Sequence, residues 1–142
     1  MARKTTCLVP VDFSRGGDKA FEYALNWAHE KKAKLIALHV VPGEIIYPPT
    51  GGRFDFYAMM EREAREKFAK LARRKRLKPG ECELVVARGA DFADIIVSAA
   101  KKLRVGLIIM GSHGRTGLRR MLLGSVAERT LRYADIPVLI VK

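Results

Sequence analysis

Cysteine is scarce in this chain of 142 residues, and long apolar runs are absent. Cys7 and Cys82 are its two cysteines, and neither lies in a CxxC or CxxxH pattern. Two such thiols make neither a disulfide framework nor a zinc site, so we expect both to be small buried hydrophobic residues. The longest apolar runs, Leu107 to Met110 and Ile136 to Val141, fall far short of the roughly 20 residues that cross a bilayer. Residues 1–6 lead into a strand pattern rather than a signal peptide, which predicts a soluble, cytoplasmic protein.

Acidic residues are also few, most of all near the end of the sequence. The chain has 27 Lys and Arg against 15 Asp and Glu, a formal net charge of +12, and residues 101–142 contain nine basic and two acidic residues. Such an excess favours an anionic ligand and raises nucleic acid as a partner. A second concentration, residues 65–78, has eight cationic residues and one acid. This basic segment also fits a solvated helix face, because Glu61, Glu63 and Glu66 each lie four residues before a basic residue of the segment.

The hydrophobic residues, 49% of the chain, exclude intrinsic disorder and alternate between two periodicities. Short apolar runs typical of strands occupy residues 5–11, 34–41, 83–87, 105–110 and 136–141, and amphipathic helical patterns separate them. Residues 42–53 are rich in proline and glycine and predict a loop. Asp91 is placed to cap one helix, and Ser125-x-x-Glu128 has the form of a capping box at the start of the last.

Five strands separated by helices predict an α/β fold. We expect a single domain over residues 1–142, with an open five-stranded parallel sheet, helices on both faces and a Rossmann-like arrangement. In such sheets a ligand binds outside the carboxyl ends of the strands, where the strand order reverses. The sequence places those ends at Val11-Asp12, Val41-Pro42, Ala87 to Gly89, and Met110-Gly111.

The segment that follows Met110 has the composition of a phosphate-binding loop. It reads Gly-Ser-His-Gly over residues 111–114, and Gly124-Ser125 stand at the next helix start. Glycines let backbone N–H groups approach an anion, and a helix N-terminus adds partial positive charge. The chain lacks the Gly-Lys-Ser/Thr of a Walker loop, and no GxGxxG follows its first strand. A loop that needs glycines only for its turns is the alternative interpretation.

The spacing of these glycines is more specific than their number. Gly111-x-x-Gly114, nine further residues and then Gly124-Ser125 resemble the G-2X-G-9X-G(S/T) motif of the universal stress protein family, in its ATP-binding branch. The segments 8–14, 38–41, 108–114 and 134–141 are also similar to that family at the expected places, so the resemblance covers essentially the whole chain. It implies the nucleotide α-hydrolase-like version of the fold and an adenine-nucleotide-binding module of the stress response.

The resemblance also implies a set of ligand-binding residues. Asp12, with Pro10 and Val11, corresponds to the segment at the adenine and ribose side, and Val41 to the position whose backbone reads the adenine edge. Gly111 and Gly114 match the glycines that border the ribose and phosphates, and Gly124, Ser125 and Val126 match the phosphate-binding turn and helix start. Met110, Ser112 and His113, in the same loop, complete the candidate binding residues, and a structural or solvent-facing role is the alternative for His113. The implied ligand is ATP, ADP or AMP, with Mg²⁺ or Mn²⁺ held through the phosphates. For Asp12 the alternative role is a helix cap or a turn.

Other functions stay open at this point. A slow ATPase or nucleotidyl-transfer enzyme fits the same fold, but His113 has no evident nucleophile and acid beside it, so no catalytic residue is assigned. The three histidines lack metal-ligand spacing, and no protein metal site is assigned. Nucleic acid binding, suggested by the charge, is expected to be non-specific. We also expect a homodimer through Ile136 to Val141, because Pro137 favours an edge strand and so apolar an edge needs a cover.

Overall fold

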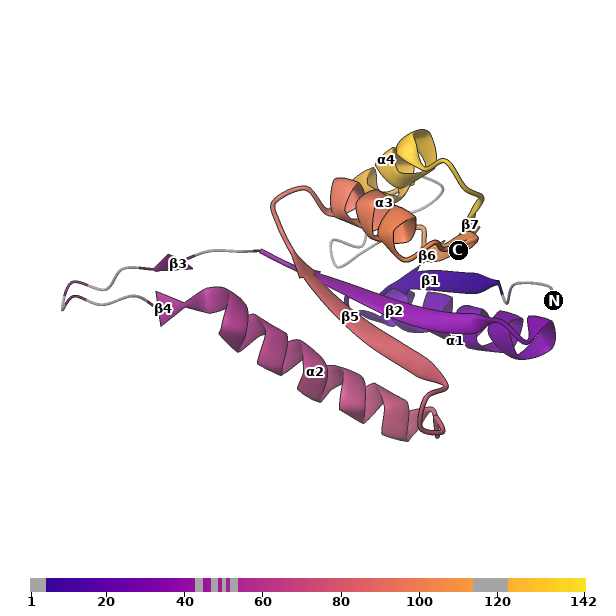
Figure 1. The fold of residues 1–142 in the computed structure, drawn as a ribbon, viewed down its shortest axis with the longest axis horizontal. Coiled ribbons are helices and arrows are strands. Elements are labelled where there is room, and N and C mark those ends of the chain that lie inside the picture. Colours follow the sequence, from indigo (N-terminus) through magenta and orange to yellow (C-terminus); the bar gives the residue numbers. More distant parts are fainter. Residues whose placement is uncertain (1–4, 43–44, 47–48, 50, 52–53, 114–122) are drawn as a thin grey trace.

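The protein is an open α/β sheet covered by helices, seen in a computed structural model that describes residues 5–42, 45–46, 49, 51, 54–113 and 123–142 (Figure 1). The elements are β1 (Thr6–Pro10), α1 (Arg15–Lys31), β2 (Lys34–Val41), β3 (Ile45–Ile46), β4 (Phe54–Asp55), α2 (Phe56–Arg74), β5 (Cys82–Arg88), α3 (Phe92–Lys102), β6 (Leu107–Gly111), α4 (Ser125–Tyr133) and β7 (Val138–Val141).

The main sheet has the strand order β5-β2-β1-β6-β7, and every neighbouring pair is parallel. The order reverses between β1 and β6, which places a switch point at the carboxyl ends of these two strands. The predicted fold class is therefore confirmed, as is the edge position of the last strand.

Alternate residues of each strand face opposite layers of helices. Val9 of β1 packs in a core with Phe21 of α1 and Leu71 of α2. Leu8, the preceding residue, packs in a second core with Ile96 of α3 and Ala127 of α4. Burial on both faces explains why the central strands are apolar without interruption.

The predicted boundaries need three corrections, one of which is that the strand expected over residues 105–110 is β6, Leu107–Gly111. Residues 42–53 were expected to form a loop, but Ile45 and Ile46 form β3, which pairs antiparallel with β4 at Asp55 and Phe54. Two-residue strands are too short to produce a periodic pattern. The last strand begins at Val138 rather than Ile136, because Pro137 has no N–H, although its carbonyl accepts a hydrogen bond from Ile108 at 3.1 Å.

The two cysteines lie in one register row of the sheet, on either side of Leu35. Both are free thiols, Cys7 fully buried and Cys82 partly so. Burial raises the pKa of each thiol to about 12, so both stay protonated at neutral pH. Among the helices of the described ranges, none is long and apolar enough to cross a membrane.

Candidate functional site

A cleft of about 370 Å³ opens where β1, β2 and β6 end and α4 begins. It lies at the switch point of the sheet, where the sequence predicts a ligand. Ten of the twelve residues predicted from the sequence line it: Pro10, Val11, Asp12, Met110, Gly111, Ser112, His113, Gly124, Ser125 and Val126.

The other two predicted residues are placed differently. Gly114 lies outside the described residues. Val41 is fully buried in the sheet, between the lining residues Val40 and Pro42, and its carbonyl accepts a hydrogen bond from the Gly89 N–H at 3.1 Å. The structure therefore brings the ends of β1 and β6 together with the start of α4, whereas Val41 belongs to the sheet beside them.

Asp12 is held in one orientation by the start of α1. Its Oδ1 accepts hydrogen bonds from the backbone N–H of Ser14 at 2.9 Å and from the Ser14 hydroxyl at 2.5 Å. Ser14 Oγ in turn accepts from the Gly17 N–H at 3.1 Å and so caps the helix. Gly17 is needed for close packing, since a Cβ there would lie 2.7 Å from Asp12 Oδ1. Asp12 is thus both a turn residue and a carboxylate on the cleft wall.

His39 of β2 forms a hydrogen bond to the residue that follows β1. Its Nδ1 donates to the Val11 carbonyl at 2.7 Å, while the Val11 N–H donates to the Leu38 carbonyl at 2.8 Å. Only 7% of His39 is exposed, and its ring centroid lies 4.9 Å from that of Phe13, whose φ of 64° is uncommon for an aromatic residue. The hydrogen bond from His39 to Val11 was not predicted from the sequence. The signal that could have indicated it is a histidine within an otherwise apolar strand.

The start of α4 is tied to the end of β6 through backbone groups. Ser112 donates its N–H to the Val141 carbonyl at 2.9 Å, and its own carbonyl accepts from the Gly124 N–H at 2.7 Å. A Cβ on Gly124 would lie 2.9 Å from that same carbonyl oxygen. Gly124 has φ −62°, so close approach, not a left-handed backbone, requires the glycine.

The predicted capping box at Ser125 and Glu128 is wrong. Gly124 occupies the N-cap position, no side chain makes a capping hydrogen bond there, and the Glu128 N–H donates to the Gly124 carbonyl at 2.9 Å. The tight turn onto Ser112 moves the cap back by one residue. Ser125 therefore presents an exposed hydroxyl at the first turn of α4, beside the N–H groups that the helix leaves unpaired.

His113 contributes a buried nitrogen to the same end of the cleft. Its Nδ1 lies 3.0 Å from Ser112 Oγ, while its Nε2 is buried and has no hydrogen-bond partner among the described residues. An orphaned buried polar atom is costly, so this nitrogen fits a site that a ligand completes.

The opposite wall of the cleft is apolar. Met60 of α2, Phe92 and Ile96 of α3, and Leu38 and Val40 of β2 line it. Phe92 is 39% exposed, so its ring is accessible to a ligand in the cleft. None of these residues was predicted, because they come from three elements that only the fold brings together. Among the described residues that line the cleft, Asp12 is the only Asp, Glu, Lys or Arg.

These features together suit a ligand with a flat apolar part and an anionic part. Helix N-terminal amides, hydroxyls and an imidazole meet the anion, and aliphatic and aromatic side chains meet the flat part. Within the described ranges no three His, Cys, Asp or Glu residues lie close enough to hold a metal ion by themselves.

The family model of the universal stress proteins matches residues 4–142. The chain belongs to the universal stress protein family. A curated universal stress protein of Methanocaldococcus jannaschii is 34% identical over 137 residues, which cover 95% of this chain and 80% of that protein.

Solved structures of the family agree. The universal stress protein UspA of Lactobacillus plantarum is similar over the whole of both chains, with a TM-score of 0.73 and 26% identity. A universal stress protein solved in complex with cAMP has a TM-score of 0.62 and 27% identity, covering 99% of this chain and 98% of its own.

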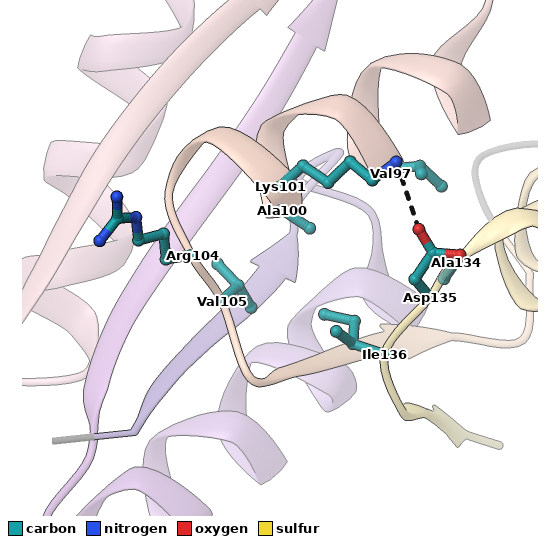
Figure 2. Close-up of a pocket in the computed structure, with 8 residues that line it drawn as sticks. All are labelled: Val97, Ala100, Lys101, Arg104, Val105, Ala134, Asp135 and Ile136. Atoms are coloured by element: carbon teal, nitrogen blue, oxygen red, sulfur yellow. Dashed lines mark ion pairs between the residues drawn. The ribbon is translucent and has the colours of Figure 1, made fainter. Parts of the chain in front are cut away.

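This member of the family has a second hollow, of about 210 Å³, between the C-terminal ends of α3 and α4 (Figure 2). Val97, Ala100, Val105 and Ile136 form its apolar floor, and a 3.2 Å ion pair between the exposed side chains of Lys101 and Asp135 crosses its mouth. No polar group of the hollow was predicted as a ligand. The hollow is lined by Val97, Ala100 and Lys101 of α3, whereas the cleft is lined by Phe92 and Ile96 nearer the start of that helix.

Proposed function

We propose that the cleft binds an adenine nucleotide and that the protein is a nucleotide-dependent regulatory module of the stress response. The observation that carries this proposal is the arrangement of Ser112, His113, Gly124 and Ser125 around one point at the start of α4. Its amides, its hydroxyls and the His113 imidazole nitrogen that has no partner among the described residues are groups that bind phosphate without a lysine.

The two ends of the cleft support an assignment of the two ends of the ligand. Phosphates would lie at the N-terminus of α4, and the base would lie against the apolar wall with Ile96 and Phe92. Asp12, oriented by Ser14, can accept hydrogen bonds from ribose hydroxyls or a base amino group. The relative solved with cAMP supports an adenine nucleotide in particular.

ATP, ADP and AMP all have the adenine base, ribose and phosphate that the cleft would bind. ATP or ADP would also carry Mg²⁺ or Mn²⁺ bound to their phosphates. Such ions keep most of their ligands from water and phosphate, which suits a cleft with a single carboxylate. No catalytic residue is proposed.

The experiment is to denature freshly purified protein, identify any released nucleotide by mass, and record melting curves with millimolar ATP, ADP, AMP and GTP. A ligand at about 100 times its Kd should stabilise the fold by roughly 2.7 kcal/mol. Adenine nucleotides should raise the Tm and GTP should raise it less. Asp12→Ala should reduce the shift, and Asp135→Ala, which removes a carboxylate at the second hollow, should leave it unchanged. Melting curves that no nucleotide shifts, with none copurified, would overturn the proposal.

We further propose that the protein is a homodimer through β7, within the segment Ile136 to Val141. This strand is apolar, partly buried, and paired with β6 on one side. Pro137 and Val141 offer their carbonyls to β6, so the N–H groups of Val138 and Ile140 point to the opposite, open edge. Two such edges can pair about a two-fold axis and cover each other.

Ile140→Pro tests this interface without breaking the bonds to β6, because it removes an N–H that faces the open edge. Analytical ultracentrifugation at tens of micromolar should show a dimer for the wild type and a folded monomer for Ile140→Pro. Ile140→Ala is the matched control, since it removes the side chain but keeps the N–H, and it should remain a dimer. A monomeric wild type, or a dimeric proline variant, would contradict the interface.

A further inference from the structure

Three helices of this protein end in the same motif, and each places a basic residue in a left-handed conformation. Lys32 follows α1 with φ 52°, Arg76 follows α2 with φ 54°, and Arg104 follows α3 with φ 52°. In each case the next residue donates its N–H to the carbonyl of an alanine five positions earlier at 2.9 Å: Ala33 to Ala28, Leu77 to Ala72, and Val105 to Ala100.

Glycine is the residue that normally occupies this position of a helix C-terminus, because a Cβ is strained at positive φ. The attraction of a cation to the helix dipole does not account for the substitution. The last turns already contain cations, Lys31 in α1 and Lys101 and Lys102 in α3. Lys32, Arg76 and Arg104 are exposed and make no ion pair with the part of the chain that is described. Their charges are therefore directed to solvent and are not neutralised by the described residues.

The parallel sheet gathers these three turns at one edge. They precede β2, β5 and β6, so they lie at the amino ends of the strands, opposite the cleft. In Figure 1 the C-terminal ends of α1 and α2 both point toward the right of the view, where β2 and β5 begin. We call this surface the basic edge: Lys32, Arg73, Arg76, Lys78, Lys102 and Arg104. All six are exposed and without an ion pair inside the described ranges.

The acidic residues of this edge do not neutralise it. Glu83 pairs with Lys34 at 3.4 Å and Asp135 with Lys101 at 3.2 Å, so both are matched by other cations. Glu81 lies 2.9 Å from the His29 ring and also accepts from the Lys78 N–H at 2.8 Å, so this one acid offsets part of the charge of six cations. In Figure 2 the Arg104 side chain points away from the Lys101–Asp135 pair. The basic edge thus keeps a net positive charge directed to solvent.

An exposed aromatic ring lies at the same edge. Tyr133 is the last residue of α4 and is 57% exposed, and the Arg129 guanidinium lies 6.0 Å from its ring centroid. The next residue, Ala134, lines the same hollow as Arg104. Cations that meet phosphates, together with an exposed ring on which a base can stack, are the two features of single-strand recognition.

We infer that the basic edge and Tyr133 bind the backbone and one base of a single-stranded nucleic acid without sequence preference. An anionic membrane would also meet the positive charge. The single-strand assignment is favoured because guanidinium groups match phosphates and because Tyr133, which is 57% exposed, offers an aromatic ring on which a base can stack. The surface is separate from the nucleotide cleft, so the inference does not depend on the proposed function.

The test is fluorescence anisotropy of labelled oligothymidylate of about 20 nucleotides with the full chain, between about 50 and 200 mM salt. The variant is Lys32→Gly, Arg76→Gly and Arg104→Gly together, because glycine relieves the backbone strain while it removes the charges. We expect affinity to fall about tenfold or more and the log-log salt slope to shrink by about two. Its melting temperature should be no lower than that of the wild type.

The matched control removes three charges from the helix starts and outer faces, with Arg15→Gln, Lys19→Gln and Arg62→Gln, and should bind within about threefold of the wild type. Tyr133→Ala should weaken binding about tenfold, and Tyr133→Phe should restore it. Millimolar ATP should not displace the probe. Absence of binding, an equal loss in the control, a glycine variant that melts well below the wild type, or binding to phosphatidylserine vesicles but not to the oligonucleotide would each overturn the inference.

Discussion

Replacing Ser125 by alanine separates a capping role from a binding role at the start of α4. The sequence pattern makes Ser125 an N-cap, whereas the structure gives that position to Gly124 and leaves the Ser125 hydroxyl without a capping bond. Ser14 provides the matched control, because its Oγ does cap α1 by accepting from the Gly17 N–H at 3.1 Å.

The two alanine variants should differ in stability without ligand. Loss of a true N-cap costs about 1 kcal/mol, and Ser14→Ala also removes the hydroxyl that donates to Asp12. Ser125→Ala removes an exposed group with no capping partner, so its unfolding free energy should stay within about 0.5 kcal/mol of the wild type. Urea denaturation followed by circular dichroism resolves this difference.

Nucleotide affinity gives a second and independent readout for Ser125. A hydrogen bond to a charged phosphate is worth about 1.5–3 kcal/mol, so Ser125→Ala should weaken nucleotide binding roughly ten- to hundredfold, measured by calorimetry. An apo Ser125→Ala protein that is destabilised by about 1 kcal/mol would refute the assigned cap, and unchanged nucleotide affinity would refute the binding role.

Two further predictions concern a close contact and an acid-sensitive pair. Gly124→Ala should lower stability by about 1–3 kcal/mol and weaken nucleotide binding, because its Cβ would lie 2.9 Å from the Ser112 carbonyl; unchanged denaturation and calorimetry would contradict this. The Lys78 backbone N–H and the His29 ring hold the pKa of the Glu81 carboxyl below its ordinary value. This contribution to stability is present at neutral pH and is lost as the pH falls through the lowered pKa, so Glu81→Gln should lose less stability than the wild type between about pH 5 and 3, and identical acid profiles from urea melts would refute it.

The strands and helices of the sheet follow from local patterns in the chain. Uninterrupted apolar runs predict β2 and β6, and Asp91 caps α3 as expected, with its Oδ1 accepting from the Asp94 N–H at 3.1 Å. Errors occur where a pattern is too short or where two signals compete. The two residues Ile45-Ile46 are too few to predict a strand. The Ser125-x-x-Glu128 pattern cannot reveal that Gly124 is hydrogen-bonded to Ser112, the residue after β6.

Local residue patterns alone predict the fold class, the five strands of the main sheet and the glycine spacing that indicates a phosphate site, because each depends on residues close together in the chain. Only the tertiary structure decided which groups meet. Packing between distant segments brings the His39 ring to the Val11 carbonyl and places Phe92 and Ile96 on the cleft wall. It also buries the Nε2 atom of His113. The left-handed backbone of Lys32 and its two counterparts is likewise invisible in a chain where glycine would be expected there. Their gathering at one edge follows from the parallel sheet, which brings the ends of successive helices to the same side.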